Sequence, residues 1–206
     1  GLGDVYKRQA MFRDPILWRF LRDDVLPSLA HKEQIKILHA GCSTGEEVYS
    51  MGILLQELDL QSKTKALAID LNSRSIISAK SAQILKMKMS ENERNYKNYY
   101  PKGSFSDYYE ELPNNYVQMN KGLIRHVEFK EHNLVSEDFK EEYDLILCRN
   151  VMIYFDQKMK IKLLSKFNNS LAPNGFFSVG FFDSLVPLID ETPVSYTHLT
   201  LPTTPY

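Results

Sequence analysis

The sequence predicts an α/β protein with a doubly wound, mostly parallel sheet, and two observations support this. An apolar run at Ile35–Leu38 is followed by a loop of small residues and then by an apolar-periodic segment, Glu46–Leu58. Strand, glycine-containing turn and helix form the first unit of such folds, whose ligands lie at the carboxyl ends of the strands. Further segments suited to strands recur along the chain at residues 65–71, 128–134, 143–148 and 176–180.

The segments between these runs predict helices and one irregular block. Phe12–Leu29 has helical periodicity and begins with Asp14-Pro15, a favourable cap and first-turn pair. Residues 72–88 and 156–171 are also predicted as helices, the second ending at Pro173-Asn174-Gly175. Residues 90–100 are expected to be partly helical, and 181–190 to be a helix or loop. Short β-like pieces are expected at residues 104–109, 116–119 and 123–129, with a hairpin turn at Asn120-Lys121-Gly122.

Length and composition indicate one globular domain and exclude some functions. The chain has 206 residues, of which 43% are hydrophobic and 25% charged, which suits a single domain with a full core. The net charge of −1 does not suggest a nucleic-acid-binding surface. No apolar run approaches a membrane span and no signal peptide is visible, so we expect no membrane insertion. Two cysteines, Cys42 and Cys148, without zinc-site spacing, suggest no metal site and a reduced, cytoplasmic protein.

The loop after the first strand indicates the ligand. Gly41 and Gly45 let the backbone approach a bound molecule, but the Gly-Lys-Ser/Thr of a P-loop and the third glycine of a dinucleotide fingerprint are missing. Glu46 and Glu47 would repel a phosphate. They suit a ligand with cationic groups, such as S-adenosylmethionine, which carries a sulfonium and an ammonium. A simpler interpretation is that both acids complement the helix dipole.

Polar residues at other strand ends fit a nucleoside. Asp70 ends the second predicted strand, about where an α/β nucleotide fold places a carboxylate on ribose hydroxyls. Asn133 ends the third and is a possible partner for adenine. The fourth strand, Tyr143–Cys148, runs into a polar, aromatic turn.

Four blocks in this order, GCSTGEEVYS, AIDLN, HNL and CRNVMIYF, resemble the chemotaxis receptor methyltransferases of the CheR family. FRDP at Phe12–Pro15 resembles the segment that leads into their catalytic domain, and the likeness covers roughly residues 10–190. The resemblance implies a class I S-adenosylmethionine-dependent methyltransferase (Rossmann-like) sheet with a small antiparallel β insert at about 102–130. It also implies the cytoplasmic domain of methyl-accepting chemotaxis receptors as partner.

The resemblance assigns roles to individual residues. Glu46, ranked before Glu47, would take the ammonium of the donor, and Asp70 the ribose hydroxyls. Tyr154 and Arg13 would orient the incoming carboxylate or the sulfonium. The remaining expected site residues are those of the first loop, the adenine frame and the end of the fourth strand: Ala40, Gly41 and Ser43; Asn133 and Leu134; Arg149 and Asn150.

Several of these residues have structural alternatives. Arg13 could be a surface arginine, Asn150 a helix N-cap and Tyr154 a core residue beside Phe155. The family has a threonine four residues before this arginine, where the present chain has Gln9. Cys148 could be a nucleophile, although buried strand cysteines are more common.

The insert and the chain ends give further expectations. In some members of the family the insert docks a receptor pentapeptide by strand addition. The longer stretch GSFSDYY argues against such docking here, and we expect the tyrosines of residues 96–109 to pack within the insert. Residues 1–9 and 194–206 are interpreted as non-native tails around a catalytic domain at 10–193. The closing hairpin of the sheet and the family's N-terminal helical domain are then expected to be missing, which leaves an unpaired strand edge.

The implied reaction is methyl transfer to a receptor glutamate, which forms a methyl ester and serves sensory adaptation. Glutamate is ionised at neutral pH, so the reaction needs no general base and depends mainly on alignment. Three alternatives remain open: a methyltransferase acting on another protein or small acid, a donor-binding module without turnover, and an inactive fragment.

Overall fold

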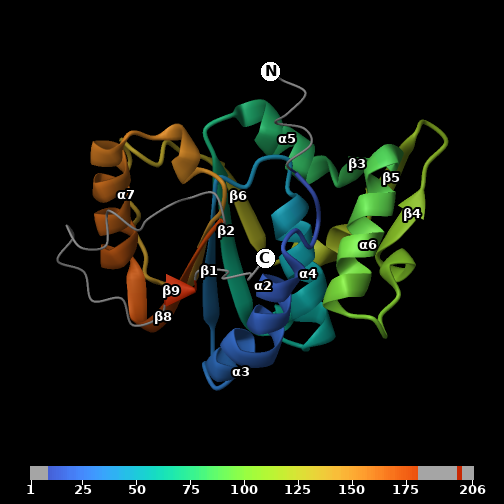
Figure 1. Ribbon diagram of the computed structural model, residues 1–206, viewed down its shortest axis with the longest axis horizontal. Helices are drawn as coiled ribbons and strands as arrows, with labels where there is room; N and C mark the ends of the chain where they lie inside the picture. The colour runs from blue at the N-terminus through green and yellow to red at the C-terminus, as the bar shows by residue number, and fades with distance from the viewer. Residues whose placement is uncertain (1–8, 181–198, 201–206) are drawn as a thin grey trace, which may run out of the picture.

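A computed structural model describes residues 9–180 and 199–200, which form a central six-stranded sheet with helices on both faces (Figure 1). The strand order is β6-β2-β1-β7-β8-β9, and every pairing is parallel. The strands are β1 (Ile35–Ala40), β2 (Thr64–Asp70), β6 (Val127–Glu131), β7 (Tyr143–Cys148), β8 (Leu171–Val179) and β9 (Leu199–Thr200). The predicted fold class is confirmed. The order reverses between β1 and β7, which is where such sheets bind ligands.

The central strands are buried on both faces, as a continuous apolar run predicts. Ile35 and Ile37 of β1 belong to a core shared with α4 (Glu46–Glu57). Leu38 and Ala40 point to the opposite core, which contains Leu163, Leu164 and Phe167 of α7 (Gln157–Asn169). The two helices therefore lie on opposite sides of the sheet (Figure 1).

The N-terminal helical segment begins at Pro15, directly after the expected cap Asp14, and is not uniform. It consists of α2 (Pro15–Phe20), the π-helical η1 (Leu21–Val25) and α3 (Leu26–Leu29). Pro15 occupies the first turn as predicted. Asp14 precedes it with a φ of 60° but makes no capping side-chain bond. Its carboxylate instead accepts a hydrogen bond from Arg149.

The prediction of one helix over residues 72–88 is wrong, because the helix ends at Ser81. Helix α5 (Ser73–Ser81) is followed by Ala82, which has a φ of 62° that a helix cannot accommodate. The chain then forms β3 (Gln83–Leu85), the 3₁₀ turn η3 (Lys86–Lys88) and α6 (Met89–Tyr99). Apolar periodicity continued through this break and concealed it.

A small antiparallel sheet of order β3-β5-β4 stands beside α6, at the right of Figure 1. Its other strands are β4 (Tyr109–Glu111), preceded by η4 (Phe105–Tyr108), and β5 (Tyr116–Met119). The antiparallel insert is thus confirmed, with one strand taken from before residue 102. The hairpin at Asn120 is wrong, because Asn120 caps the 3₁₀ turn η5 (Lys121–Ile124), its side chain accepting from the Gly122 amide.

Tyrosines fasten this insert to the main domain through one carboxylate. The hydroxyls of Tyr96, Tyr99 and Tyr108 donate to Glu57, in the last turn of α4, at 2.6, 2.5 and 3.2 Å. Burial first, and then the neighbouring carboxylate, raise the pKa of Tyr96 and Tyr99. Tyr96 and Tyr99 are buried as expected, but their rings contact Phe12, so they pack against the main domain and not within the insert alone.

The end of α7 and the course of strand β8 differ from the prediction. Helix α7 ends at Asn169, so Pro173-Asn174-Gly175 does not terminate it. That tripeptide lies within β8, where the register against β7 shifts and Asn174 has a φ of 60°. The edge of β8 expected to be unpaired carries β9 at Phe177 and Ser178. Strand β9 falls in the stretch interpreted as a tail, and residues 181–190 lie outside the described ranges.

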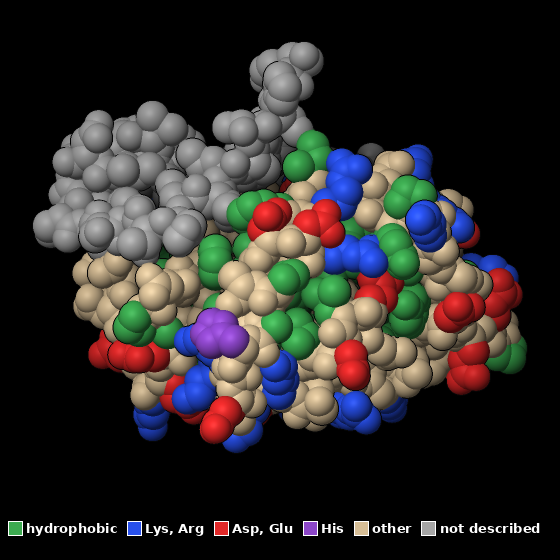
Figure 2. Space-filling view, turned by 90° about the horizontal axis from the view of Figure 1, so that it is seen from below, with side chains coloured by type: hydrophobic (Ala, Val, Ile, Leu, Met, Phe, Trp, Pro, Cys, Tyr) green, Lys and Arg blue, Asp and Glu red, His purple; other side chains and the backbone are tan. Residues whose placement is uncertain are grey.

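The remaining short elements are η2 (Gln61–Lys63) and η6 (Met152–Tyr154). No helix within the described ranges has the length and apolar character that a membrane span requires. On the face seen from below, acidic and basic side chains are interspersed, in keeping with the near-zero net charge (Figure 2).

Candidate functional site

One cavity of about 730 Å³ lies at the carboxyl ends of β1, β2, β6 and β7. This volume is in the range of roughly 300–1,000 Å³ that small-molecule sites occupy. Every expected site residue except Ala40 lines it: Arg13, Gly41, Ser43, Glu46, Asp70, Asn133, Leu134, Arg149, Asn150 and Tyr154. The sequence blocks that carried the resemblance therefore meet at one place.

The turn after β1 is built for close approach. The amides of Gly41 and Cys42 both donate to the carbonyl of Ile69 at 2.8 Å, which ties the turn to β2. Gly41 has a φ of +81°, and a Cβ there would lie 2.4 Å from Cγ2 of Val151. Only glycine fits. Ala40, expected to bind the donor, is buried at the end of β1 and does not line the cavity.

Asp70 is held by backbone groups. Its two carboxylate oxygens accept from the amides of Ser43 and Asn72, both at 2.9 Å. These bonds fix the carboxylate at the cavity wall, and each oxygen retains acceptor capacity for a hydroxyl of a ligand.

Asn133 begins a turn whose amides at Val135 and Ser136 donate to its side-chain oxygen at 2.9 and 3.2 Å. Because the oxygen is committed to the turn, a hydrogen bond to a base would have to come from Nδ2. Leu134, 8% exposed, supplies apolar surface beside it.

His132 also lines the cavity. It was not predicted as a site residue, although it belongs to the HNL motif that carries the resemblance. Its ring stacks on Phe139 with centroids 5.5 Å apart and is 5% exposed. Burial lowers its pKa, although Glu137 opposes this effect. The lowered pKa favours the neutral ring, and the ring adds a flat surface to the cavity.

Both acids of the first helical turn already have cationic partners. Glu46 accepts from Lys88 Nζ at 2.9 Å and from the Thr44 hydroxyl at 2.6 Å. Glu47 contacts His39 Nδ1 at 3.0 Å and Arg149 Nη1 at 3.5 Å. Burial raises the pKa of Glu47, but the hydrogen bond and charge of His39 and the charge of Arg149 outweigh it, so the pKa is lowered. The sequence predicted both acids as candidate site residues. It did not predict that they pair with Lys88, His39 and Arg149.

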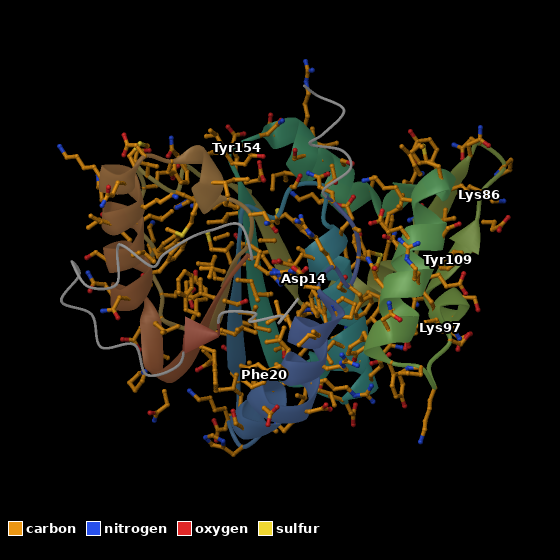
Figure 3. All side chains as sticks on the ribbon, viewed as in Figure 1. Asp14, Phe20, Lys86, Lys97, Tyr109 and Tyr154 are labelled. Atoms are coloured by element: carbon orange, nitrogen blue, oxygen red, sulfur yellow. The ribbon has the colours of Figure 1, made fainter. Side chains whose placement is uncertain are left out.

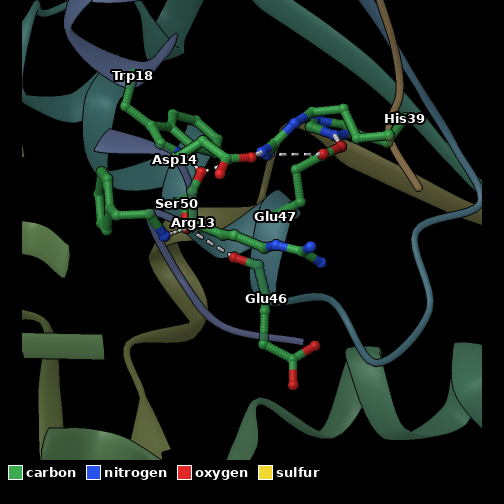
Figure 4. Close-up of polar contacts among 9 residues, drawn as sticks. Arg13, Asp14, Trp18, His39, Glu46, Glu47 and Ser50 are labelled. Carbon is green, nitrogen blue, oxygen red and sulfur yellow. Dashed lines mark hydrogen bonds and ion pairs between the residues drawn. The ribbon is translucent and has the colours of Figure 1, made fainter. Parts of the chain in front are cut away.

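Arg149 is the centre of a partly buried group of charges that includes Asp14 and Glu47, two residues labelled in Figure 4. Its guanidinium donates to the Asp14 carboxylate, and to the carbonyl oxygen of Arg13 at 3.0 Å. It also lies 6.0 Å from the Trp18 ring centroid, and its side chain is 5% exposed. Arg149 lines the cavity as expected, and its guanidinium is directed to Asp14 and Glu47. Arg13 lies beside Glu46 and Glu47 in the close-up, and all three line the cavity.

Tyr154 is 65% exposed, so the alternative that it packs in the core is wrong. It ends η6 and lies near the upper end of the sheet in Figure 3. The N-cap alternative for Asn150 is also wrong. Asp156 caps α7 by accepting from the Met159 amide at 2.8 Å, and Asn150 instead adopts a φ of 60° directly after β7.

Gln9 lines the cavity at the place where the family has threonine. Its amide nitrogen donates to Ser43 Oγ, and its amide oxygen accepts from Thr44 Oγ1 at 2.9 Å. A residue placed in the expected tail thus bridges to the loop after β1.

Both cysteines are buried, and burial raises the pKa of the Cys42 thiol, which makes it a poor nucleophile. Within the described residues, no group of three His, Cys, Asp or Glu side chains could hold a metal ion.

Comparison with known proteins identifies the family. The family described as "CheR methyltransferase, SAM binding domain" matches residues 7–197. Cher3 of Pseudomonas putida is 38% identical over 175 residues, covering 85% of this chain and 64% of Cher3. A chemotaxis protein methyltransferase of Borreliella burgdorferi is 33% identical over 191 residues, covering 84% and 63%. The chain therefore spans slightly less than two thirds of these relatives.

Among solved structures, PKMT2 from Rickettsia typhi in complex with AdoHcy overlaps with a TM-score of 0.41. It is 20% identical, and the overlap covers 70% of this chain and 20% of that one. This overlap is too slight to bear on the assignment, which depends on the family match. The chain belongs to the CheR methyltransferase family and contains its S-adenosylmethionine-binding domain, with S-adenosylmethionine as the cofactor.

Proposed function

We propose that this chain transfers the methyl group of S-adenosylmethionine to glutamate side chains in the cytoplasmic domain of chemotaxis receptors, forming methyl esters. The observation that carries the proposal is the meeting of Arg13, Asp70, Asn133 and Tyr154 in one cavity, from four separate segments of the chain. The names of the relatives favour chemotaxis receptors as substrates.

The volume of the cavity and the polar groups on its wall support this cofactor. The glycine turn at Gly41 allows a ligand to lie against the backbone, and the Asp70 carboxylate suits a pair of ribose hydroxyls. His132, Asn133 and Leu134 offer stacking surface, an amide and apolar area to a base. Neither phosphate nor metal chemistry is needed to explain this set. Glu46 would receive the donor's ammonium beside Lys88, which already balances part of its charge.

The reaction requires little acid–base catalysis from the protein. A carboxylate oxygen of the substrate glutamate forms a bond to the methyl carbon while the carbon–sulfur bond breaks and its electron pair stays on sulfur. The substrate is ionised at neutral pH, so no proton has to be removed. The main contribution of the chain is therefore to align the two groups, which is worth several kcal/mol.

Arg13 and Tyr154 are the groups we assign to the incoming carboxylate. A guanidinium matches a carboxylate geometrically, and a phenol hydroxyl can donate one further hydrogen bond. Arg149 instead acts as a positioning residue, because it holds the carbonyl of Arg13 at 3.0 Å. The exposure of Tyr154 at the cavity supports a macromolecular substrate, since a side chain on a protein surface must reach the donor without being engulfed.

The test combines binding and turnover. Titration calorimetry should show S-adenosylhomocysteine binding to the chain, and radiolabelled donor should give base-labile methyl groups on receptor cytoplasmic fragments. Tyr154→Phe should lower kcat by at least about tenfold with little change in donor affinity. Tyr109→Phe, on the small sheet, is the matched control and should leave both unchanged.

Each alternative has its own result in the same experiment. Methylation of small carboxylic acids or of other proteins, but not of receptor fragments, would reassign the substrate. Binding without any methyl transfer would indicate a donor-binding module or an inactive fragment. If S-adenosylhomocysteine did not bind at all, the proposal would be abandoned.

A further inference from the structure

Residues 9–14, which we call the N-terminal strap, cross from the cavity into the core and back. Gln9, Ala10 and Arg13 line the cavity, whereas the side chains of Met11 and Phe12 are fully buried. The strap precedes α2 and has no regular secondary structure. Its position is therefore determined by contacts with other elements and not by a backbone ladder of its own.

Helix α6 holds both backbone polar groups of one strap residue. The amide of Met11 donates to Asn92 Oδ1 at 3.0 Å, and its carbonyl accepts from Asn95 Nδ2 at 3.0 Å. Asn92 and Asn95 are three positions apart, so they share one face of the helix. Asn92 is fully buried, and a buried amide is costly unless its hydrogen bonds are made. The pair therefore fixes Met11 in place and in direction.

The next strap residues are held in conformations that they would not choose alone. Phe12 and Asp14 have φ values of 50° and 60°, in the left-handed region that side chains other than glycine disfavour. The Phe12 amide donates to Ser50 Oγ at 2.9 Å, and the Phe12 ring stacks on Tyr99 of α6 with centroids 4.7 Å apart. Such strain persists only where the surroundings impose it, so a loosened contact should let the strap relax.

We propose that Asn92 and Asn95 are positioning residues for the methyl-donor end of the cavity. Through Met11 they set where Ala10 and Arg13 lie, one residue before and two residues after it. The proposal rests on the proposed function for the role of Arg13. It places part of the control of the donor site on α6, the helix that also carries the tyrosines of the insert.

The test separates the two ends of the ligand. S-Adenosylhomocysteine has an amino-acid end that reaches toward Arg13, whereas adenosine occupies only the part near Asp70 and Asn133. Asn95→Ala removes one hydrogen bond from the strap and should weaken S-adenosylhomocysteine binding by about fivefold, with adenosine unchanged. Asn95→Asp places an acceptor against the Met11 carbonyl and should weaken it further. Asn98→Ala, exposed on the same helix, should change neither ligand.

A second pair of variants and a second measurement guard against a purely structural effect. Asn92→Asp keeps the acceptor oxygen for the Met11 amide and should bind S-adenosylhomocysteine better than Asn92→Leu does. Amide hydrogen exchange, which needs no ligand, should be faster at residues 11–13 in Asn95→Ala than in Asn98→Ala, and unchanged in β7.

The outcomes decide between the two proposals. Equal weakening of both ligands, or strap exchange identical in the Asn95 and Asn98 variants, would overturn the positioning role. If the unmodified chain bound neither ligand, the proposed function would fail, and the exchange result would still show whether α6 fixes the strap.

Discussion

The two ends of the cavity are built in different ways. At the end near Asp70 and Asn133, side chains bond to backbone amides of the adjoining loops. At the end near Arg13, side chains pair with side chains: Arg149 reaches Glu47 and Asp14 over 102 and 135 positions of sequence. Where backbone amides hold a side chain in place, the substitution of another side chain leaves that contact intact. A wall made of paired, partly buried charges depends on each member, because removal of Arg149 leaves two carboxylates without their shared partner.

The largest effect should come from Arg149→Met. The substitution leaves the Asp14 and Glu47 carboxylates without their shared guanidinium, so the free energy of unfolding should fall by about 3 kcal/mol in urea denaturation. Lys36→Met, which breaks the exposed pair with Glu141, is the control and should cost less than about 1 kcal/mol. Equal losses in the two variants would remove the distinction between the two ends.

Asp70→Ala should act on the other end without this global cost. It removes a charged acceptor from the proposed ribose site, so the Kd values for adenosine and S-adenosylhomocysteine should both rise by at least about tenfold. Glu131→Ala, an exposed acid opposite Asp70 in the register of β2 and β6, should leave both Kd values unchanged. Calorimetric titration with each ligand gives the comparison, and a loss confined to S-adenosylhomocysteine would contradict it.

Acidification should lower the free energy of unfolding through His126, whose ring nitrogens are buried. Burial lowers the pKa of His126 from 6.5 to about 4, and the neighbouring His39 and Arg125 add to this. The unfolded chain therefore binds more protons than the folded one between those values. The stability present above pH 6.5 is lost as the pH falls toward 4. We expect His126→Leu to flatten this pH dependence by on the order of 1 kcal/mol relative to His31→Gln, an exposed control. The urea midpoint of each variant should be measured as a function of pH across this range. If the midpoints of His126→Leu and His31→Gln changed in parallel, His126 would not be the cause of the pH dependence.

The smallest effect should come from Lys88→Met. It frees one oxygen of Glu46 for the ammonium of the ligand, so S-adenosylhomocysteine should bind about threefold more tightly, while adenosine binds as before. Lys86→Met, on the same 3₁₀ turn but paired with the exposed Glu111, is the control. Weaker binding in the Lys88 variant would mean that this lysine itself contacts the ligand.

The same contrast explains what the sequence could predict. The place of Gly41, Asp70 and Asn133 in the cavity was predictable because each lies at or just after the end of a strand, and β7 was located at its observed bounds. The partners of Glu46 and Met11 were not, since Lys88 and Asn92 lie 42 and 81 positions away and no local pattern marks them. Likewise, nothing in the apolar periodicity signalled the left-handed residues Ala82 and Asn174, which broke one predicted helix and moved the start of one strand.

The three tyrosine hydroxyls gathered on Glu57 have a consequence for engineering. Anyone who transplants the small sheet and α6 onto another methyltransferase must bring an acceptor at the end of α4 with them. Without it, up to three phenols would face an apolar surface with no acceptor, each a desolvated donor that opposes the graft. The portable unit is therefore larger than the insert: it includes the last turn of α4, to which the insert is anchored.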